Sequence, residues 1–343
     1  RELLLGTEAS GTAYLGESDL AQCDGFLIGG DAFAANPTCS RGVFDSRAVN
    51  PRVPIAVIDP GAGSAVKFAS LPIATPPGGE LAALAAAARG AGVDVPDLCT
   101  PAGLDVDAAR AAGAALARAK RPAVLLAAEY GRGGAWRQIG LLAGKIAAAM
   151  GGGVACQTNG ANALAALRLG PRLETISLAE ALGRKDAEWA AIGCDVLAAL
   201  GMADRSLLAA AAALPNRSTR SARIVLPAAL AAELGGTYLL AGEKQVRVDA
   251  AARPPAGAAS PAAIIAAIAR AAGANVPRAA AEVGKLSRLA GPAPKLQDAP
   301  PLAPPEHFTV LLGRRAIDAG CGEITSPVDA WNDLDKVHVR SNG

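Results

Sequence analysis

The stretch between residues 221 and 248 constrains the fold more than any other part of the chain. A short β-branched run at residues 223–226 stops at Pro227, and an alanine- and leucine-rich segment then carries a single acid, Glu233. A glycine pair follows at residues 235–236, after which the chain becomes extended again. This order of residue types predicts a buried strand, a helical turn, a tight glycine turn, and then extended segments on either side of a polar loop.

Two earlier segments also end a strand in a turn. An apolar run at residues 24–28 leads into a glycine-aspartate turn at residues 29–31, and a second run at residues 54–58 leads into an Asp-Pro turn at residues 59–60. Such turns place backbone N–H groups at the carboxyl edge of a parallel sheet, where α/β folds bind phosphates and nucleotides. We therefore predict an α/β fold with two adjacent domains that have mostly parallel sheets.

The expected domains divide the chain into four parts. Residues 1–102 and 103–290 are the two α/β domains, residues 291–306 form a proline-rich linker, and residues 307–343 begin a truncated β-rich C-terminal domain. The chain starts without a methionine and stops in mid-pattern, so we expect it to be a piece of a longer polypeptide.

Composition argues against several classes of function. The net charge is +2, with 33 basic and 31 acidic residues interspersed, so no nucleic-acid partner is expected. The six cysteines form no C-x-x-C pair, which leaves no iron–sulfur or zinc motif. With only His307 and His338 present, we assign no catalytic residue and no metal ligand. The apolar runs are interrupted before they reach membrane-spanning length, so no direct membrane span is expected.

The 221–248 stretch resembles the signature of the molybdopterin oxidoreductase superfamily. In that family an Ala-Asp-Val-Val-Leu-Pro strand end leads to an acid, a Gly-Thr pair and an Asn-x-Glu-Gly-Arg-x-Gln loop. Residues 222–227 match the first part, Glu233 and the Gly-Thr pair at 236–237 match the second, and residues 242–245 approximate the third. The chain departs from the pattern at Arg223, where the family has Asp, and at Leu240, where it has Asn.

The two strand-end turns resemble the same family. Its Gly-x-Asn-Pro segment corresponds to residues 27–33 with Asn36-Pro37, and its Val-x-Asp-Pro-Arg-x-Thr segment, which helps to hold the cofactor phosphates, corresponds to residues 57–65. Gly61, Gly63 and Ser64 replace the arginine and threonines of the family. Loss of a charged hydrogen-bonding partner costs roughly 1.5–3 kcal/mol, so the sequence predicts that a molybdopterin dinucleotide binds weakly or not at all.

The resemblance implies a set of cofactor-binding candidates at these turns. They are Gly29, Gly30, Asp31, Asp59, Pro60, Gly236, Thr237, Glu243 and Gln245. Asp31 can instead be interpreted as an Asx turn that ends its strand. Asp59-Pro60 can instead be interpreted as an ordinary turn at a strand end. Because both loops face the cofactor in that family, residues 242–245 are expected near Asp59.

Residues 159–162 and the Leu-Gly-Pro at 169–171 resemble a segment found in molybdopterin enzymes and in the largest peripheral-arm subunit of NADH:quinone oxidoreductase. The same resemblance implies a strand at residues 207–214, although Leu-Leu-Ala-Ala-Ala-Ala-Ala-Leu is a strong helix former.

Three hypotheses for function follow. The first is a molybdopterin-oxidoreductase-like subunit of a redox, electron-transfer complex such as NADH:quinone oxidoreductase, without its own pterin. Its partners would be other subunits of that complex, in the cytoplasm or attached to a membrane through the complex. The second is a catalytic molybdenum or tungsten enzyme similar to formate or formylmethanofuran dehydrogenase, with its iron–sulfur and metal-ligand region upstream. The third is a nucleotide-binding α/β protein without a redox role.

Overall fold

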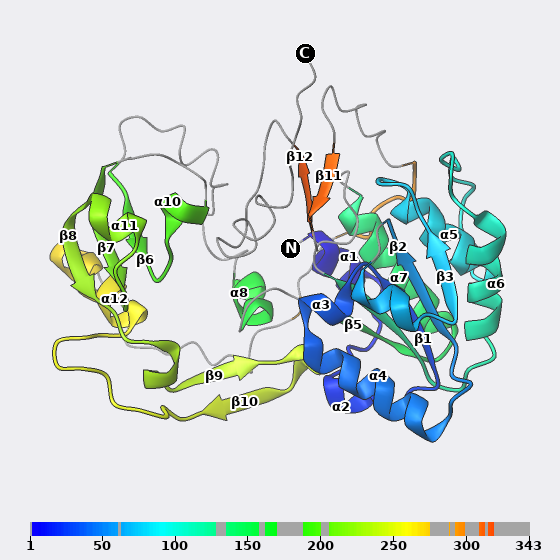
Figure 1. The fold of residues 1–343 in the computed structure, drawn as a ribbon, viewed down its shortest axis with the longest axis horizontal. Coiled ribbons are helices and arrows are strands. Elements are labelled where there is room, and N and C mark those ends of the chain that lie inside the picture. The colour runs from blue at the N-terminus through cyan, green and yellow to red at the C-terminus, as the bar shows by residue number, and fades with distance from the viewer. Residues whose placement is uncertain are drawn as a thin grey trace, which may run out of the picture.

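The fold is α/β, as the sequence predicts (Figure 1). The computed structural model describes residues 2–60, 63–127, 135–157, 162–169, 188–199, 206–274, 288, 292–298, 309–312 and 315–318. Within these ranges, no helix is long and apolar enough to cross a membrane.

A parallel sheet of five strands forms the first unit. Its strand order is β3-β2-β1-β4-β5. The strands are β1 (Gly25–Gly29), β2 (Ile55–Asp59), β3 (Leu71–Ala74), β4 (Pro122–Ala127) and β5 (Gly153–Gln157). Every residue of β1 and β4 is buried, as is typical of parallel strands that are covered on both faces. Tyr14 extends the sheet through a parallel bridge to Val154 of β5.

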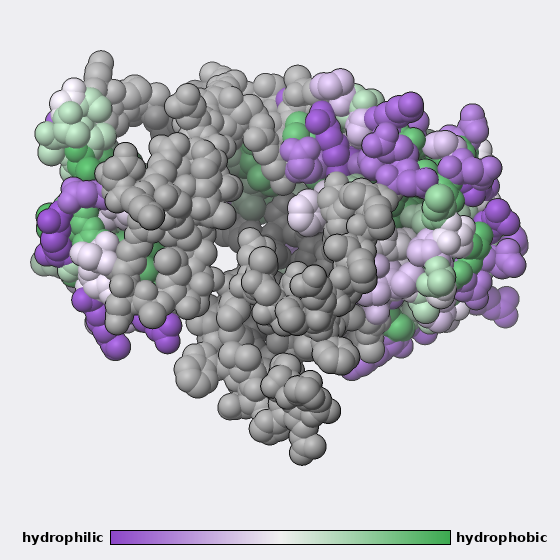
Figure 2. Space-filling view, turned by 90° about the horizontal axis from the view of Figure 1, so that it is seen from above, coloured by the Kyte–Doolittle hydropathy of each residue, from purple (hydrophilic) through white to green (hydrophobic). Residues whose placement is uncertain are grey.

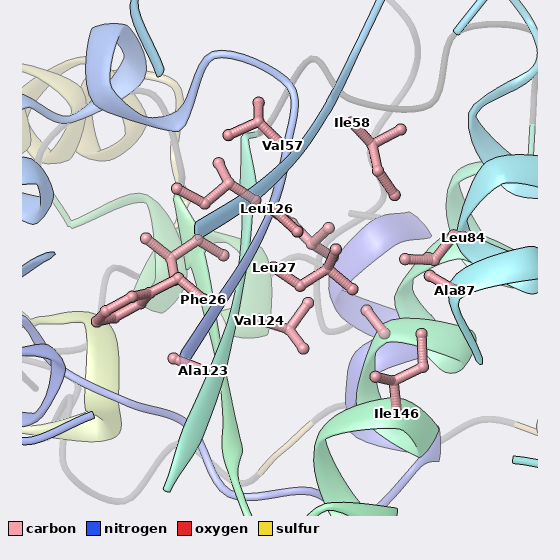
Figure 3. Close-up of a cluster of buried hydrophobic side chains, with 14 of the residues drawn as sticks. Phe26, Leu27, Val57, Ile58, Leu84, Ala87, Ala123, Val124, Leu126 and Ile146 are labelled. Carbon is pink, nitrogen blue, oxygen red and sulfur yellow. The ribbon is translucent and has the colours of Figure 1, made fainter. Parts of the chain in front are cut away.

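Helices cover both faces of this sheet. They are α1 (Glu2–Ala9), α2 (Glu17–Leu20), α3 (Ala32–Ala35), α4 (Pro37–Val49), α5 (Glu80–Gly90), α6 (Val106–Leu116) and α7 (Trp136–Ala149), with a 3₁₀ turn, η1 (Ser64–Phe68). Figure 3 shows Leu27 and Val124 on the side of Leu84 of α5 and Ile146 of α7, whereas Phe26 lies on the opposite side. The alternation of side chains along each strand thus supplies a core to both helical layers.

Glycines bring two helix pairs into close contact. A Cβ on Gly113 of α6 would lie 1.8 Å from the Ala87 carbonyl oxygen of α5, and one on Gly140 of α7 would lie 2.0 Å from that of Leu3 in α1. Only a residue without a side chain allows the backbones to approach this closely.

The second unit is a smaller parallel sheet with the order β6-β7-β8. It consists of β6 (Ala190–Ile192), β7 (Leu207–Ala212) and β8 (Ala222–Pro227), with α10 (Val196–Ala199), α11 (Arg217–Ser221) and α12 (Pro261–Ala271) around it. The strand implied at residues 207–214 is confirmed as β7. Parallel pairing on both sides of β7 outweighs the helix propensity of its alanines.

A β-hairpin connects the second unit back to the first. It consists of β9 (Gly236–Leu239) and β10 (Gln245–Val248), which pair antiparallel, with the 3₁₀ turns η3 (Ala231–Glu233) before it and η4 (Ala241–Glu243) at its tip. Helix α8 (Ala163–Leu169) packs beside β9. The order of elements expected between residues 221 and 248 is therefore present. The prediction that its first strand is buried is wrong, because β8 lies at an edge of the sheet and its residues are exposed or half-buried.

The expected division near Ala102 falls inside the first unit. Strand β4 lies beyond this point in the sequence, yet it pairs with β1 from Gly25↔Pro122 to Gly29↔Leu126. The larger sheet therefore extends to Gln157 and is not divided at residue 102. Near the C-terminus, β11 (Thr309–Leu312) and β12 (Arg315–Asp318) form a two-stranded antiparallel sheet. Both histidines lie outside the described residues.

Candidate functional site

A cavity of about 780 Å³ lies where the hairpin tip meets the carboxyl end of β5. Its wall includes Asn36, Cys156, Gln157, Asn162, Leu239 and Lys244. The carboxyl edge of a parallel sheet is the usual ligand-binding edge of α/β folds. The cavity is therefore the candidate site of the described chain.

One wall of the cavity is a hydrogen-bonded polar cluster. Asn36 caps α4 by accepting a hydrogen bond from Thr38 N at 3.2 Å. Its Nδ2 donates to Gln157 Oε1 at 3.0 Å and to Glu17 Oε1 at 3.1 Å. This amide therefore connects the loop after β1 to the end of β5.

Asn162 fixes the hairpin to the opposite wall. Its Oδ1 accepts from Leu239 N at 2.9 Å, and its Nδ2 donates to Thr237 O at 3.0 Å, so the side chain pairs with the edge of β9 as a peptide group would. Asn162 holds a left-handed conformation with φ 63°, which asparagine tolerates better than most residues.

A partly buried ion-pair cluster joins the hairpin tip to the first unit. Arg168 Nη2 donates to Glu8 Oε1 at 2.8 Å, and it also donates to Glu243 at the tip. The side chains of Arg168 and Glu8 are 3% and 0% exposed, so both charges are out of water. Arg288 binds both carboxylate oxygens of Glu243 and donates to Thr12 O at 3.0 Å. We call these four side chains, Glu8, Arg168, Glu243 and Arg288, the latch.

The latch and the cavity wall contain groups with displaced pKa values. Hydrogen bonds from Arg288, and then from Arg168, hold the pKa of Glu243 below its ordinary value despite partial burial. Burial raises the pKa of the Cys156 thiol to about 12. This thiol is therefore protonated at neutral pH and is a poor nucleophile.

We expect the contribution of the latch to stability to disappear only in acid. A depressed carboxyl pKa contributes stability above the unfolded value, near 4.3 for Glu, and this is lost as the pH falls through the folded value. The difference in unfolding free energy between the wild type and Glu243→Gln should therefore stay constant from about pH 8 to about pH 5 and shrink below about pH 4. Urea unfolding across this range measures it, with the exposed Asp45→Asn as control. A difference that shrinks already above pH 5 would contradict this assignment.

The first two strand-end turns form a second, separate cluster. Asp31 Oδ1 accepts from Ala34 N at 3.1 Å and so caps α3, and its Oδ2 accepts from Ser64 N at 2.9 Å. The Ser64 hydroxyl also donates to Asp31 Oδ1, at 2.5 Å. A Cβ on Gly63 would lie 2.4 Å from Asp59 Oδ2 and 3.1 Å from Asp31 Cγ. Two carboxylates thus flank the segment where the resemblance placed cofactor phosphates.

The structure divides the predicted cofactor residues into two groups. Gly29, Gly30, Asp31, Asp59 and Pro60 lie at the ends of β1 and β2, whereas Gly236, Thr237, Glu243 and Gln245 belong to the hairpin.

The strand order corrects the expectation that residues 242–245 lie near Asp59. The hairpin tip packs on residue 16, where a Cβ on Gly242 would lie 2.5 Å from Gly16 N. Going from β2 to this segment crosses β1, β4 and β5, which is four strand spacings or about 19 Å at the usual separation. Because β4 pairs with β1 and β5 pairs with β4, these strands lie between the two loops.

No local pattern in the sequence indicates most of the latch. Glu8, Arg168 and Arg288 come from distant parts of the chain, and no local spacing connects them. Asn162 lies in the Asn-containing segment already noted at residues 159–162, which was a usable sequence signal.

The fold and cavity define an α/β protein with a candidate binding site at the carboxyl edge of a parallel sheet. No protein-family model and no curated protein matches the chain. Among solved structures, it is similar in fold to a chain of the formyltransferase/hydrolase complex of Methylorubrum extorquens, whose crystal structure contains methylofuran. The TM-score is 0.51 at 13% identity, and the match covers 79% of this chain and 80% of that chain. At this identity the similarity concerns the fold alone.

Proposed function

We propose that the chain is a molybdopterin-oxidoreductase-like subunit of a multi-subunit assembly, in which it acts as a scaffold and does not hold a pterin dinucleotide. The arrangement of Asp31, Ser64 and Asp59 carries this proposal. The Ser64 N–H and hydroxyl, which could donate to a phosphate, both donate to Asp31 instead. A diphosphate placed here would meet two carboxylates, so the residues present do not fit the cofactor.

The charges near the hairpin support the same proposal. Phosphate sites commonly use a guanidinium because its planar donors match the oxygens. The guanidinium groups of Arg168 and Arg288 are instead directed at Glu8 and Glu243. These arginines hold the chain together and are already neutralised by carboxylates.

The fold similarity favours one kind of assembly. The similar chain belongs to a formyltransferase/hydrolase complex, so a complex that handles formyl groups is better supported for this chain than one that resembles NADH:quinone oxidoreductase. In such a complex the chain would position partner subunits, and the chemistry would be done by those partners.

The principal alternative is an active molybdenum or tungsten enzyme. It would be similar to formylmethanofuran dehydrogenase, with the pterin bound in the cavity beside Lys244, an exposed residue on its wall. The distinction is measurable because bound pterin is released on denaturation.

We expect the purified protein to release no pterin above background. The protein is expressed in a host that makes the dinucleotide, denatured and oxidised, and its pterin fluorescence is compared with that of a molybdopterin enzyme from the same host. Because Asp31 occupies the donors of Ser64, binding should be too weak to survive purification. One pterin dinucleotide or more per chain would reject the scaffold proposal in favour of the enzyme.

A further inference from the structure

Strand β8 forms an edge of the smaller sheet, and no strand of the described residues pairs with its outer side. The residue that follows β8, Ala228, donates its N–H to the carbonyl oxygen of Ala212, the last residue of β7. Hydrogen-bonding direction alternates along a strand, so Ile224 faces β7, whereas the N–H and C=O groups of Arg223 and Val225 face outward. Farther along, Ala259 N donates to Pro227 O and covers the outer edge there. The open stretch is therefore centred on Val225.

The side chains around this open edge are apolar and exposed. Ile224 is 50% exposed and Val225 is 54% exposed, and they project from opposite faces of the sheet. Natural edge strands are usually protected by charges, bulges or a covering element, because a bare apolar edge pairs with other chains. Two consecutive exposed β-branched side chains are thus unusual for an edge strand whose outer side is unpaired.

The charge of the surroundings indicates what kind of chain fits. Arg217, Arg220 and Arg223 are all exposed, and the segment from Ala213 to Pro227 contains no acid. Arg223 pairs with Glu188, but both side chains remain more than half exposed. Figure 2 shows charged and apolar residues side by side at the left end of the molecule, where β8 lies in Figure 1.

We propose that the outer edge of β8 binds an extended, acidic segment of a partner subunit, which adds a fourth strand to the three-stranded sheet. Main-chain hydrogen bonds to Arg223 and Val225 would provide affinity, and carboxylates that pair with Arg223 and with the exposed arginines of the preceding α11 would provide selectivity. The identity of the partner as another subunit rests on the proposed function, whereas recognition of an acidic strand does not.

The charge of this edge gives a second copy of the chain no favourable contact. Two β8 strands paired antiparallel about Val225 would place Arg223 of each strand opposite Pro227 of the other, and residues 213–227 contain no acid that could pair with it. An acidic segment meets the same surface with favourable charge.

The test uses Val225→Pro, which removes the outward N–H without removing a hydrogen bond to β7. Val225→Thr keeps the N–H and is the matched control. The probe is a fluorescein-labelled eight-residue peptide that alternates Glu with Val, and its binding to the whole chain is followed by fluorescence anisotropy. We expect Val225→Pro to weaken binding at least about tenfold, and Val225→Thr to change it less than about twofold.

A second variant keeps the test decisive if Val225→Pro fails to fold. The double substitution Arg220→Glu and Arg223→Glu leaves the backbone of β8 intact and should reverse the preference from the Glu-Val peptide to a Lys-Val peptide. Absence of binding to the wild type, or equal binding by all variants, overturns the proposal. Dimerisation of the wild-type chain that is lost in Val225→Pro, measured by sedimentation, would assign the edge to a second copy and also overturn it. Discovery of bound pterin would reject the scaffold function without altering the peptide result.

Discussion

Replacing Arg168 with methionine should lower the free energy of unfolding by about 3–5 kcal/mol, because it removes the guanidinium that pairs with the buried Glu8 carboxylate. The Glu8 side chain is 0% exposed and accepts two hydrogen bonds from this guanidinium. Methionine fills much of the same volume, so the loss reports the charge and hydrogen bonds more than a cavity. Chemical denaturation of the whole chain, with intrinsic fluorescence as the readout, measures the change.

The matched control is Arg41→Met, since Arg41 forms an exposed ion pair with Asp45 on α4. Pairs of this kind contribute at most about 1 kcal/mol. The double variant Glu8→Gln and Arg168→Met should recover part of the loss, because it removes both charges together. Equal losses for Arg168→Met and Arg41→Met would show that the latch does not stabilise the chain.

Replacing Gly113 with alanine should destabilise the protein by about 3 kcal/mol, against the normal trend in helices. Alanine is ordinarily about 1 kcal/mol better than glycine in a helix interior. Here the new methyl group would lie 1.8 Å from the Ala87 carbonyl oxygen, so α5 and α6 must move apart. The sign of the effect therefore distinguishes close helix packing from intrinsic propensity.

Ala111→Leu on the same helix is the control for Gly113→Ala. Residue 111 is exposed, and leucine is a good helix former, so the change should stay within about 0.5 kcal/mol. Both variants are compared by thermal and urea unfolding. A stabilisation by Gly113→Ala would contradict the close approach of the two helices.

The Asp31 cluster and the latch beside the candidate site were only partly predictable. The strand-end turns at Asp31 and Asp59 were visible because glycine, aspartate and proline punctuate apolar runs, and both turns lie at the carboxyl ends of parallel strands. What they do was not visible, since the bond from Ser64 N to Asp31 joins residues 33 positions apart. The latch was hidden for the same reason, because Glu8 and Arg168 are 160 positions apart.

The sequence by itself determined the α/β class, through local patterns that depend on neighbouring residues only. Apolar runs that stop at a glycine or a proline set β1, β2 and β8, and Asp105 caps α6 through a hydrogen bond from Ala108 N. Tertiary structure alone decided which strands share a sheet, so β4 joined β1 across the expected boundary. It also decided that the alanines of β7 form a strand, because two neighbouring strands offered hydrogen bonds and burial that outweigh a small per-residue helix preference.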